Sequence, residues 1–206
     1  MELLKSPHWE TVTPEIKSLL AFTGQQDFSN RFYLAGGTAL ALQMGHRLSV
    51  ALDFFSEKDE VHARTRREII KAFENHNGQV LENVDGNLLV LVRNIRVGFF
   101  SYGYKLLRPV QTVENIALAA LLDLGLMKLA ALIGRGGRKD FYDVYVISQQ
   151  IPLADLLEAG RLKYPQLRDF AMMAIESIVL FDNGDRDLQP SMLIDLSWDE
   201  LKVYFV

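Results

Sequence analysis

The sequence contains no cysteine, which excludes disulfide bridges, thiolate metal sites and cysteine nucleophiles and is consistent with a reducing compartment. It also lacks a recognisable export signal, because its first residues include acids, a tryptophan and prolines. The most apolar stretch, residues 116–133, is interrupted by Asp123 and Lys128, and charges at the centre of a bilayer are costly. We therefore expect a soluble, cytoplasmic protein with no membrane segment.

An excess of basic residues is also missing, since the net charge is −4. Any contact with nucleic acid must come from a local patch, such as Arg135, Arg138 and Lys139. What the sequence does have is 206 residues with 49% hydrophobic and 23% charged side chains, which is typical of a chain that folds around a sizeable core. This composition excludes a disordered polymer but names no function.

The hydrophobic pattern changes from mixed to helical near residue 110, so we expect a core lobe over residues 1–110 and a helical lobe over residues 111–206. In the first part the pattern predicts helices from Pro14 and over residues 38–44 and 61–75, and strands over 31–36, 48–55, 79–84, 88–92 and 95–102. In the second part it predicts helices over 117–134, 139–150, 153–163, 165–180 and 198–204, and a surface loop over 182–187.

A short strand ends in Gly36-Gly37-Thr38, and a helix follows at once. The first backbone N–H groups of a helix lie at the positive end of its dipole and bind phosphate without a basic side chain. The Thr38 hydroxyl would add a further polar group there. The alternative is that the glycines only allow a tight turn between strand and helix.

Asp53 stands in the otherwise apolar run 48–55, which we expect to be a strand buried on both faces. A buried carboxylate needs a hydrogen-bond partner, a counter-charge or a metal. Metal-dependent phosphoryl transfer uses carboxylates at alternate strand positions, which face the same side, but here the alternate residue is Ala51. Asp53 therefore either caps a helix or pairs with Arg47, or belongs to a functional site.

Lys128 lies on an apolar helix, and Arg135 follows seven residues later on about the same face. Glycines end that helix, and Asp140 and Asp143 share one face of the next. We predict that Lys128 contacts these aspartates, because an unpaired ammonium on an apolar face is costly. The cluster either holds a triphosphate through Lys128 or is an ion-pair network that joins two helices.

Together these motifs resemble the AbiEii/AbiGii toxin family, whose members are nucleotidyltransferase-like proteins of abortive-infection and toxin–antitoxin systems. The resemblance implies an α+β fold, in which a nucleotidyltransferase-like mixed sheet is flanked by helices and a C-terminal helical lobe closes over the nucleotide. It follows the chain in order through residues 33–42, 45–49, 52–55, Asp123, 128–131, Arg135 and 139–145.

The resemblance also implies site residues and a cofactor. A nucleoside triphosphate would be the substrate, and Mg²⁺ the expected ion, with Asp53 as its ligand. The implied nucleotide-binding residues are Gly36, Gly37, Thr38, Ser49, Lys128 and Arg135. The implied catalytic residues are Asp53, Lys128, Asp140 and Asp143.

The chain departs from the family at Ala51, which stands where the first motif aspartate is expected, and at Gly98, where more distant relatives have a third. The alanine is either native to a degenerate member or a substitution that silences a toxin. The expected function is a toxin-type nucleotidyltransferase that transfers a nucleotide to an RNA (tRNA-like) or protein acceptor, impaired by Ala51. The alternatives are a catalytically degenerate module that binds a nucleotide or a cognate antitoxin, and a helical interaction protein without a nucleotide site.

Overall fold

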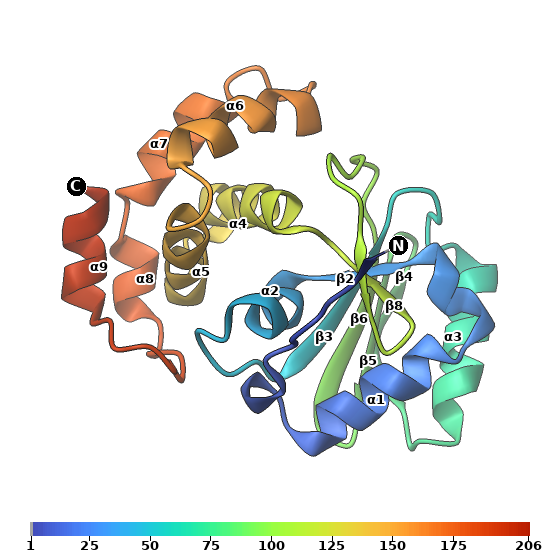
Figure 1. Ribbon diagram of the computed structural model, residues 1–206. Coiled ribbons are helices and arrows are strands. Elements are labelled where there is room, and N and C mark those ends of the chain that lie inside the picture. The colour runs from blue at the N-terminus through green and yellow to red at the C-terminus, as the bar shows by residue number, and fades with distance from the viewer. Residues whose placement is uncertain (1) are drawn as a thin grey trace.

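The computed structural model describes residues 2–206, and these residues form an eight-stranded mixed sheet with helices on both sides (Figure 1). The strand order is β1-β7-β8-β2-β3-β6-β5-β4. The neighbours β3 and β6 at the centre are parallel, whereas β2 is antiparallel to β3. Strands β6, β5 and β4 form an antiparallel meander that runs to one edge of the sheet. The strands are β1 (Glu2–Leu3), β2 (Tyr33–Ala35), β3 (Ala51–Ser56), β4 (Gln79–Val84), β5 (Asn87–Val92), β6 (Ile95–Ser101), β7 (Gln111–Val113) and β8 (Ile116–Leu118).

Helices α1 and α3 cover one side of the sheet, and the C-terminal helices gather on the other side beyond α2 (Figure 1). Over residues 2–206, none of the helices is long and apolar enough to cross a membrane. The α-helices are α1 (Pro14–Gly24), α2 (Gly36–Met44), α3 (Ala63–Glu74), α4 (Leu121–Arg135), α5 (Arg138–Ser148), α6 (Leu153–Lys163), α7 (Phe170–Ile178), α8 (Asp182–Arg186) and α9 (Trp198–Phe205). Two 3₁₀ helices, at Trp9–Thr11 and Asp27–Arg31, precede β2 in the described chain.

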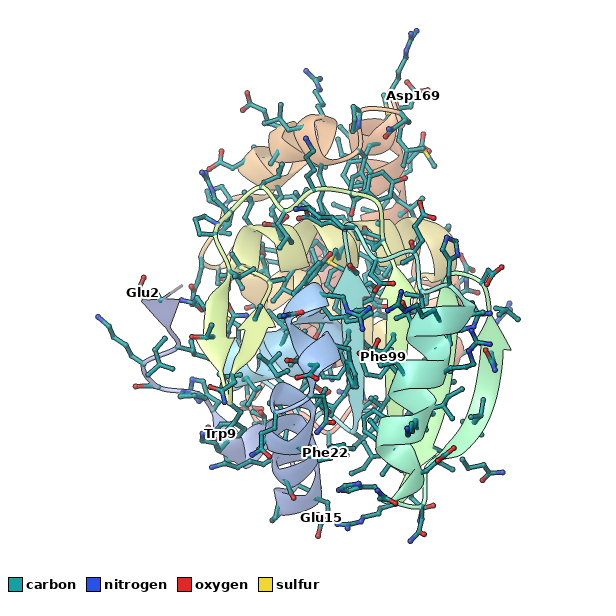
Figure 2. The ribbon with its side chains drawn as sticks, turned by 90° about the vertical axis from the view of Figure 1, so that its right-hand side faces the viewer. Glu2, Trp9, Glu15, Phe22, Phe99 and Asp169 are labelled. Atoms are coloured by element: carbon teal, nitrogen blue, oxygen red, sulfur yellow. The ribbon has the colours of Figure 1, made fainter. Side chains whose placement is uncertain are left out.

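The core between the sheet and helices α1 and α3 centres on Phe99 of β6, whose ring packs against Phe28, Phe54 and Phe73. Figure 2 looks at the molecule from this side and labels Phe99 there. Side chains alternate along β3, so that Phe54 is buried and Asp53 is only half-buried. Our expectation that this strand is buried on both faces was wrong, because its second face belongs to the site described below.

The strands expected over residues 79–102 are confirmed as β4, β5 and β6, and the strand and helix around Gly36 as β2 and α2. Other boundaries differ. The helix predicted from residue 117 begins only at Leu121, because residues 111–118 form the β7–β8 hairpin, which pairs with β2 through β8. All-helical structure therefore starts after the boundary expected near residue 110.

The segment 182–187 was predicted as a loop, but most of it forms the short helix α8. Two contacts from distant parts of the chain hold it. The Trp198 Nε1 atom donates to Asp185 Oδ1 at 2.6 Å, and Arg138 donates through its Nε atom to the Gly184 carbonyl at 2.7 Å. Local turn residues therefore favoured a loop, whereas packing against α5 and α9 stabilises a helix.

A buried ion pair ties α4 to α6. The Nζ atom of Lys163 is 2.7 Å from Asp123 Oδ1, and both side chains are fully buried. Asp123 also accepts hydrogen bonds from the backbone N–H groups of Leu107 and Arg108, while Lys163 donates to the Lys105 carbonyl. This pair therefore connects the loop after β6 to the helical part of the chain.

We expect Lys163→Met to lower the free energy of unfolding by about 3–5 kcal/mol, because it leaves the buried Asp123 carboxylate without its counter-charge. Urea unfolding followed by circular dichroism measures this change. The Lys163→Met, Asp123→Leu double variant should recover part of the loss, since it removes the unpaired charge as well. A single variant as stable as the parent protein would contradict a role for the pair in stability.

Candidate active site

The Gly36-Gly37 turn at the start of α2 lies against side chains of two other segments. Gly36 has φ +65°, and a Cβ atom there would lie 2.8 Å from Asp53 Oδ2. A Cβ atom on Gly37 would lie 2.6 Å from the Nη2 atom of Arg47. Gly36 therefore requires glycine, and at Gly37 a larger residue would have to displace Arg47. The free N–H groups of the first helical turn lie beside a carboxylate and a guanidinium.

The two hydroxyl groups predicted to bind nucleotide are buried. Thr38 Oγ1 and Ser49 Oγ are hydrogen-bonded at 2.8 Å, and Thr38 also donates to the Ala51 carbonyl. These bonds fasten the N-terminus of α2 to the segment that leads into β3. In this structure both side chains therefore position the Gly-Gly turn.

We expect Gly37→Ala to lower the free energy of unfolding by about 1–3 kcal/mol, since the new methyl group must displace Arg47. Gly134→Ala in α4 is a matched control, because a Cβ atom there meets nothing within 4 Å. That control should leave stability unchanged or raise it by up to about 1 kcal/mol. Urea unfolding compares the two variants, and equal stability would contradict the close packing of the turn on Arg47.

Asp143 of α5 is surrounded by hydrogen-bond donors. Arg47 donates to it through Nε at 2.7 Å and through Nη2 at 2.8 Å, and His46 Nε2 lies 2.7 Å from Oδ1. The Nζ atom of Lys128 is 2.5 Å from Oδ2. Burial opposes ionisation, but the charges of Lys128 and Arg47 and their hydrogen bonds hold the pKa of Asp143 well below its usual value. The Asp143 carboxylate is therefore ionised, and both of its oxygens are bonded to neighbouring side chains.

Asp140, one turn earlier on α5, contacts two cations, of which it shares Lys128 with Asp143. Lys128 donates to Oδ1 at 2.9 Å, and Arg135 donates through Nε to Oδ2 at 2.7 Å. Our prediction that Lys128 contacts Asp140 and Asp143 is thus confirmed. We call these five residues, Arg47, Lys128, Arg135, Asp140 and Asp143, the charged network. It joins α4 and α5 to the segment after α2. Helix α2 itself lies between these helices and the sheet in Figure 1.

Asp53 differs from the other two aspartates, since it accepts no side-chain hydrogen bond from the residues described, 2–206. It pairs with neither Arg47 nor a helix N-terminus, so the structural roles that the sequence left open for it are wrong. Burial raises the pKa of Asp53, while the charges of Lys128 and Lys139 act in the opposite direction. A half-buried, unbonded carboxylate beside cations is a group that a ligand can reach and use.

Several important residues were not found from the sequence. His46 and Arg47 both contact Asp143, although they lie almost half the chain away from it. The proposed basic patch is divided, because Arg138 donates to the Gly184 and Asp185 carbonyls instead of facing the site. Within residues 2–206, Lys139 makes no such bond, and its charge acts on Asp53. Partial burial, together with neighbouring cations such as Arg135, lowers the pKa of Lys139.

The residues around Asp53 do not fit the metal site that the resemblance implies. On the same sheet face, the neighbouring positions are Ala51 and Gly98, and neither has an oxygen ligand in its side chain. The Phe100 ring covers Gly98, where a Cβ atom would lie only 2.4 Å from it. Residues 2–206 contain no group of three or more histidine, cysteine or acidic side chains placed to hold a metal. Asp53 alone cannot hold a pair of divalent ions.

The sequence is similar to one known family and to a protein of another organism. The family described as nucleotidyl transferase AbiEii toxin, type IV toxin–antitoxin system, matches residues 18–96, which include the Gly-Gly turn and Asp53. An uncharacterised protein of Aquifex aeolicus (strain VF5) is 31% identical over 182 residues, or 85% of each chain.

Among solved structures, the nucleotidyltransferase toxin MenT4 of Mycobacterium tuberculosis H37Rv superposes with a TM-score of 0.55 and 17% identity, covering 92% of this chain and 81% of MenT4. JHP933 from Helicobacter pylori is also similar, with a TM-score of 0.49 and 16% identity over 80% of this chain and 87% of its own. MenT4 shares the nucleotidyltransferase-like fold that the sequence led us to expect. The chain belongs to the AbiEii nucleotidyltransferase toxin family.

Proposed function

We propose that the chain binds a nucleoside triphosphate at the Gly36-Gly37 turn and transfers its nucleotide to a hydroxyl group of an RNA (tRNA-like) or protein acceptor. One observation supports this most strongly. The N-terminus of α2, the unbonded carboxylate of Asp53 and the charged network around Lys128 come from separate parts of the chain and meet side by side. Groups that gather in this way from several elements are typical of active sites.

In the proposed complex, the N–H groups of Gly36, Gly37 and Thr38 bind phosphate oxygens at the positive end of α2. Lys128 uses its ammonium group on Asp140 and Asp143 in the free protein, and this group has a third proton to donate. Asp140 and Asp143 act as positioning residues, because their oxygens are engaged by the cations that they hold.

The transfer itself forms a bond between the acceptor oxygen and the α-phosphorus and breaks the bond from that phosphorus to the bridging oxygen. Pyrophosphate leaves, and the proton of the acceptor hydroxyl passes to the Asp53 carboxylate. The raised pKa of Asp53 makes it a better base than an ordinary aspartate. Lys128 and Arg135 stabilise the charge that develops on the leaving group, so catalysis rests mainly on positioning and electrostatics.

The family suggests a divalent metal in general and a cognate antitoxin as partner. Because the side chains near Asp53 do not hold a metal pair, any Mg²⁺ in the site would have to arrive bound to the triphosphate. We also propose that the protein acts in the cytoplasm, where nucleoside triphosphates and acceptor RNAs are present.

The proposal is tested by incubating the protein with each labelled nucleoside triphosphate and with total RNA and total protein from a bacterial extract. Label in one RNA or protein band that depends on the added chain is the expected result. An Asp53→Asn variant is the control, because it keeps the shape of the side chain and removes the base. Labelling that survives this substitution undiminished would contradict the role of Asp53.

A second function is favoured by Ala51 and by the Phe100 ring over Gly98. With these residues the chain would be a degenerate module that binds a nucleotide or an antitoxin without transfer. Nucleotide binding with no labelling of any acceptor, even after prolonged incubation, would support this alternative. An antitoxin encoded by the neighbouring gene would identify its protein partner.

A further inference from the structure

The sheet face around Asp53 carries an arginine, Arg96, beside the positions where carboxylates are expected. In the parallel pairing of β3 with β6, Ala51 is the partner of Arg96 and Asp53 is the partner of Gly98. Residues in register on parallel strands point to the same face. Arg96 therefore lies on the same face as Asp53, directly beside the position of the missing aspartate.

Arg96 is exposed, and none of the acidic side chains in residues 2–206 forms a salt bridge with it. Its guanidinium donors are thus available to a ligand. The charge of Arg96 also acts on Asp53. Burial raises the pKa of Asp53, and Arg96 is one of the cations that lower it. The charged arginine next to Ala51 is therefore part of the same electrostatic environment as Lys128 and Lys139.

The local charge favours a polyanion. The basic side chains of the charged network, with Lys139 and Arg96, outnumber the three carboxylates of Asp53, Asp140 and Asp143, although the whole chain has a net charge of −4. A metal-dependent site neutralises phosphates through ions held by carboxylates. Here the carboxylate positions are an alanine and a ring-covered glycine, and a guanidinium, whose donors match the geometry of phosphate oxygens, stands beside them.

We propose that Arg96 binds the phosphates in place of a divalent cation, so that this chain binds nucleoside triphosphates without Mg²⁺. The inference rests on the proposed function, because it concerns the same nucleotide site. It concerns nucleotide binding and not nucleotide transfer, because binding needs only positive charge and hydrogen-bond donors. Arg96 belongs to no motif that the sequence analysis found. The inference makes it the residue that allows the nucleotide to bind without Mg²⁺.

Isothermal titration of the protein with ATP, GTP, CTP and UTP, each in EDTA and in Mg²⁺, tests the proposal. We expect the preferred nucleotide to bind in EDTA with a Kd within about threefold of its value in Mg²⁺. Arg96→Met should weaken binding in EDTA by about tenfold or more, as expected for the loss of a charged hydrogen bond. Arg96→Lys should retain part of the affinity, because it keeps the charge but not the paired donors.

Arg67→Met is the matched control, since Arg67 is exposed on α3, which covers the other side of the sheet. This control should bind like the parent protein in both buffers. Binding that requires Mg²⁺, or an Arg96→Met variant with unchanged affinity in EDTA, would overturn the inference and leave the proposed function standing. Failure of every nucleotide to bind in either buffer would overturn both.

Discussion

Replacing Lys128 by methionine should abolish triphosphate binding, with a loss of affinity of about 100-fold or more. The ammonium group sits between Asp140 and Asp143 and retains one proton for a phosphate oxygen. Methionine has a similar length but neither charge nor donor, so the substitution removes a charged hydrogen bond at the centre of the site. Isothermal titration with each nucleoside triphosphate measures the effect.

The same substitution should cost less stability than its burial suggests. Asp143 keeps Arg47 and His46 as donors, and Asp140 keeps Arg135, so neither carboxylate is left alone. We expect a loss below the about 3–5 kcal/mol typical of a wholly unpaired buried charge. Lys163→Met is the matched control, since it removes another buried, paired lysine outside the site.

The control should be less stable than Lys128→Met but should bind nucleotide normally once the folded fraction is taken into account. The opposite pattern, in which Lys128→Met keeps the affinity of the parent protein, would assign Lys128 to structure alone. Unfolding in urea and titration calorimetry on the same preparations separate the two effects, because the first reports folding and the second reports the site.

Some features could be predicted because they depend on neighbours in the sequence. The β2–α2 turn follows from two glycines between a strand and a helix, and the β4–β6 meander from alternating side chains around short turns. The contact of Lys128 with Asp140 and Asp143 follows from consecutive helices that present opposite charges. The turn and the meander follow from local backbone geometry, and the Lys128 contact follows from the free-energy cost of burying an unpaired charge.

Other features depend on contacts between distant segments. Arg47 and Asp143 lie 96 positions apart, and nothing near either residue indicates the other. The β7–β8 hairpin turns at Glu114 and Asn115, which both have positive φ, and Glu114 is not a usual residue for that conformation. The ring of Phe100 over Gly98 likewise depends on the rotamer of one side chain in the folded sheet.

Restoring an aspartate at position 51 should raise nucleotide transfer by about 10²–10³-fold, the usual effect of a lost or regained ligand or donor at the reacting centre. The new carboxylate would lie on the same face as Asp53 and beside Arg96. It would add a second oxygen ligand for a divalent ion and would partly neutralise the arginine. Transfer should then rise with added Mg²⁺, and binding should become dependent on it.

The assay is incorporation of labelled nucleotide into total RNA and protein, together with growth after induction of each variant. Ala51→Asn is the control, because it has the size of aspartate but not its charge, and it should stay at the level of the parent chain. Phe100 remains over Gly98 in all these variants, so any gain reports the carboxylate at position 51 and not a third ligand. Strong labelling by the Ala51 chain, unchanged when the aspartate is restored, would mean that transfer proceeds without the paired carboxylates. Lys128, Arg96 and the N-terminus of α2 would then have to supply the charge stabilisation that metal ions provide in other phosphoryl-transfer enzymes.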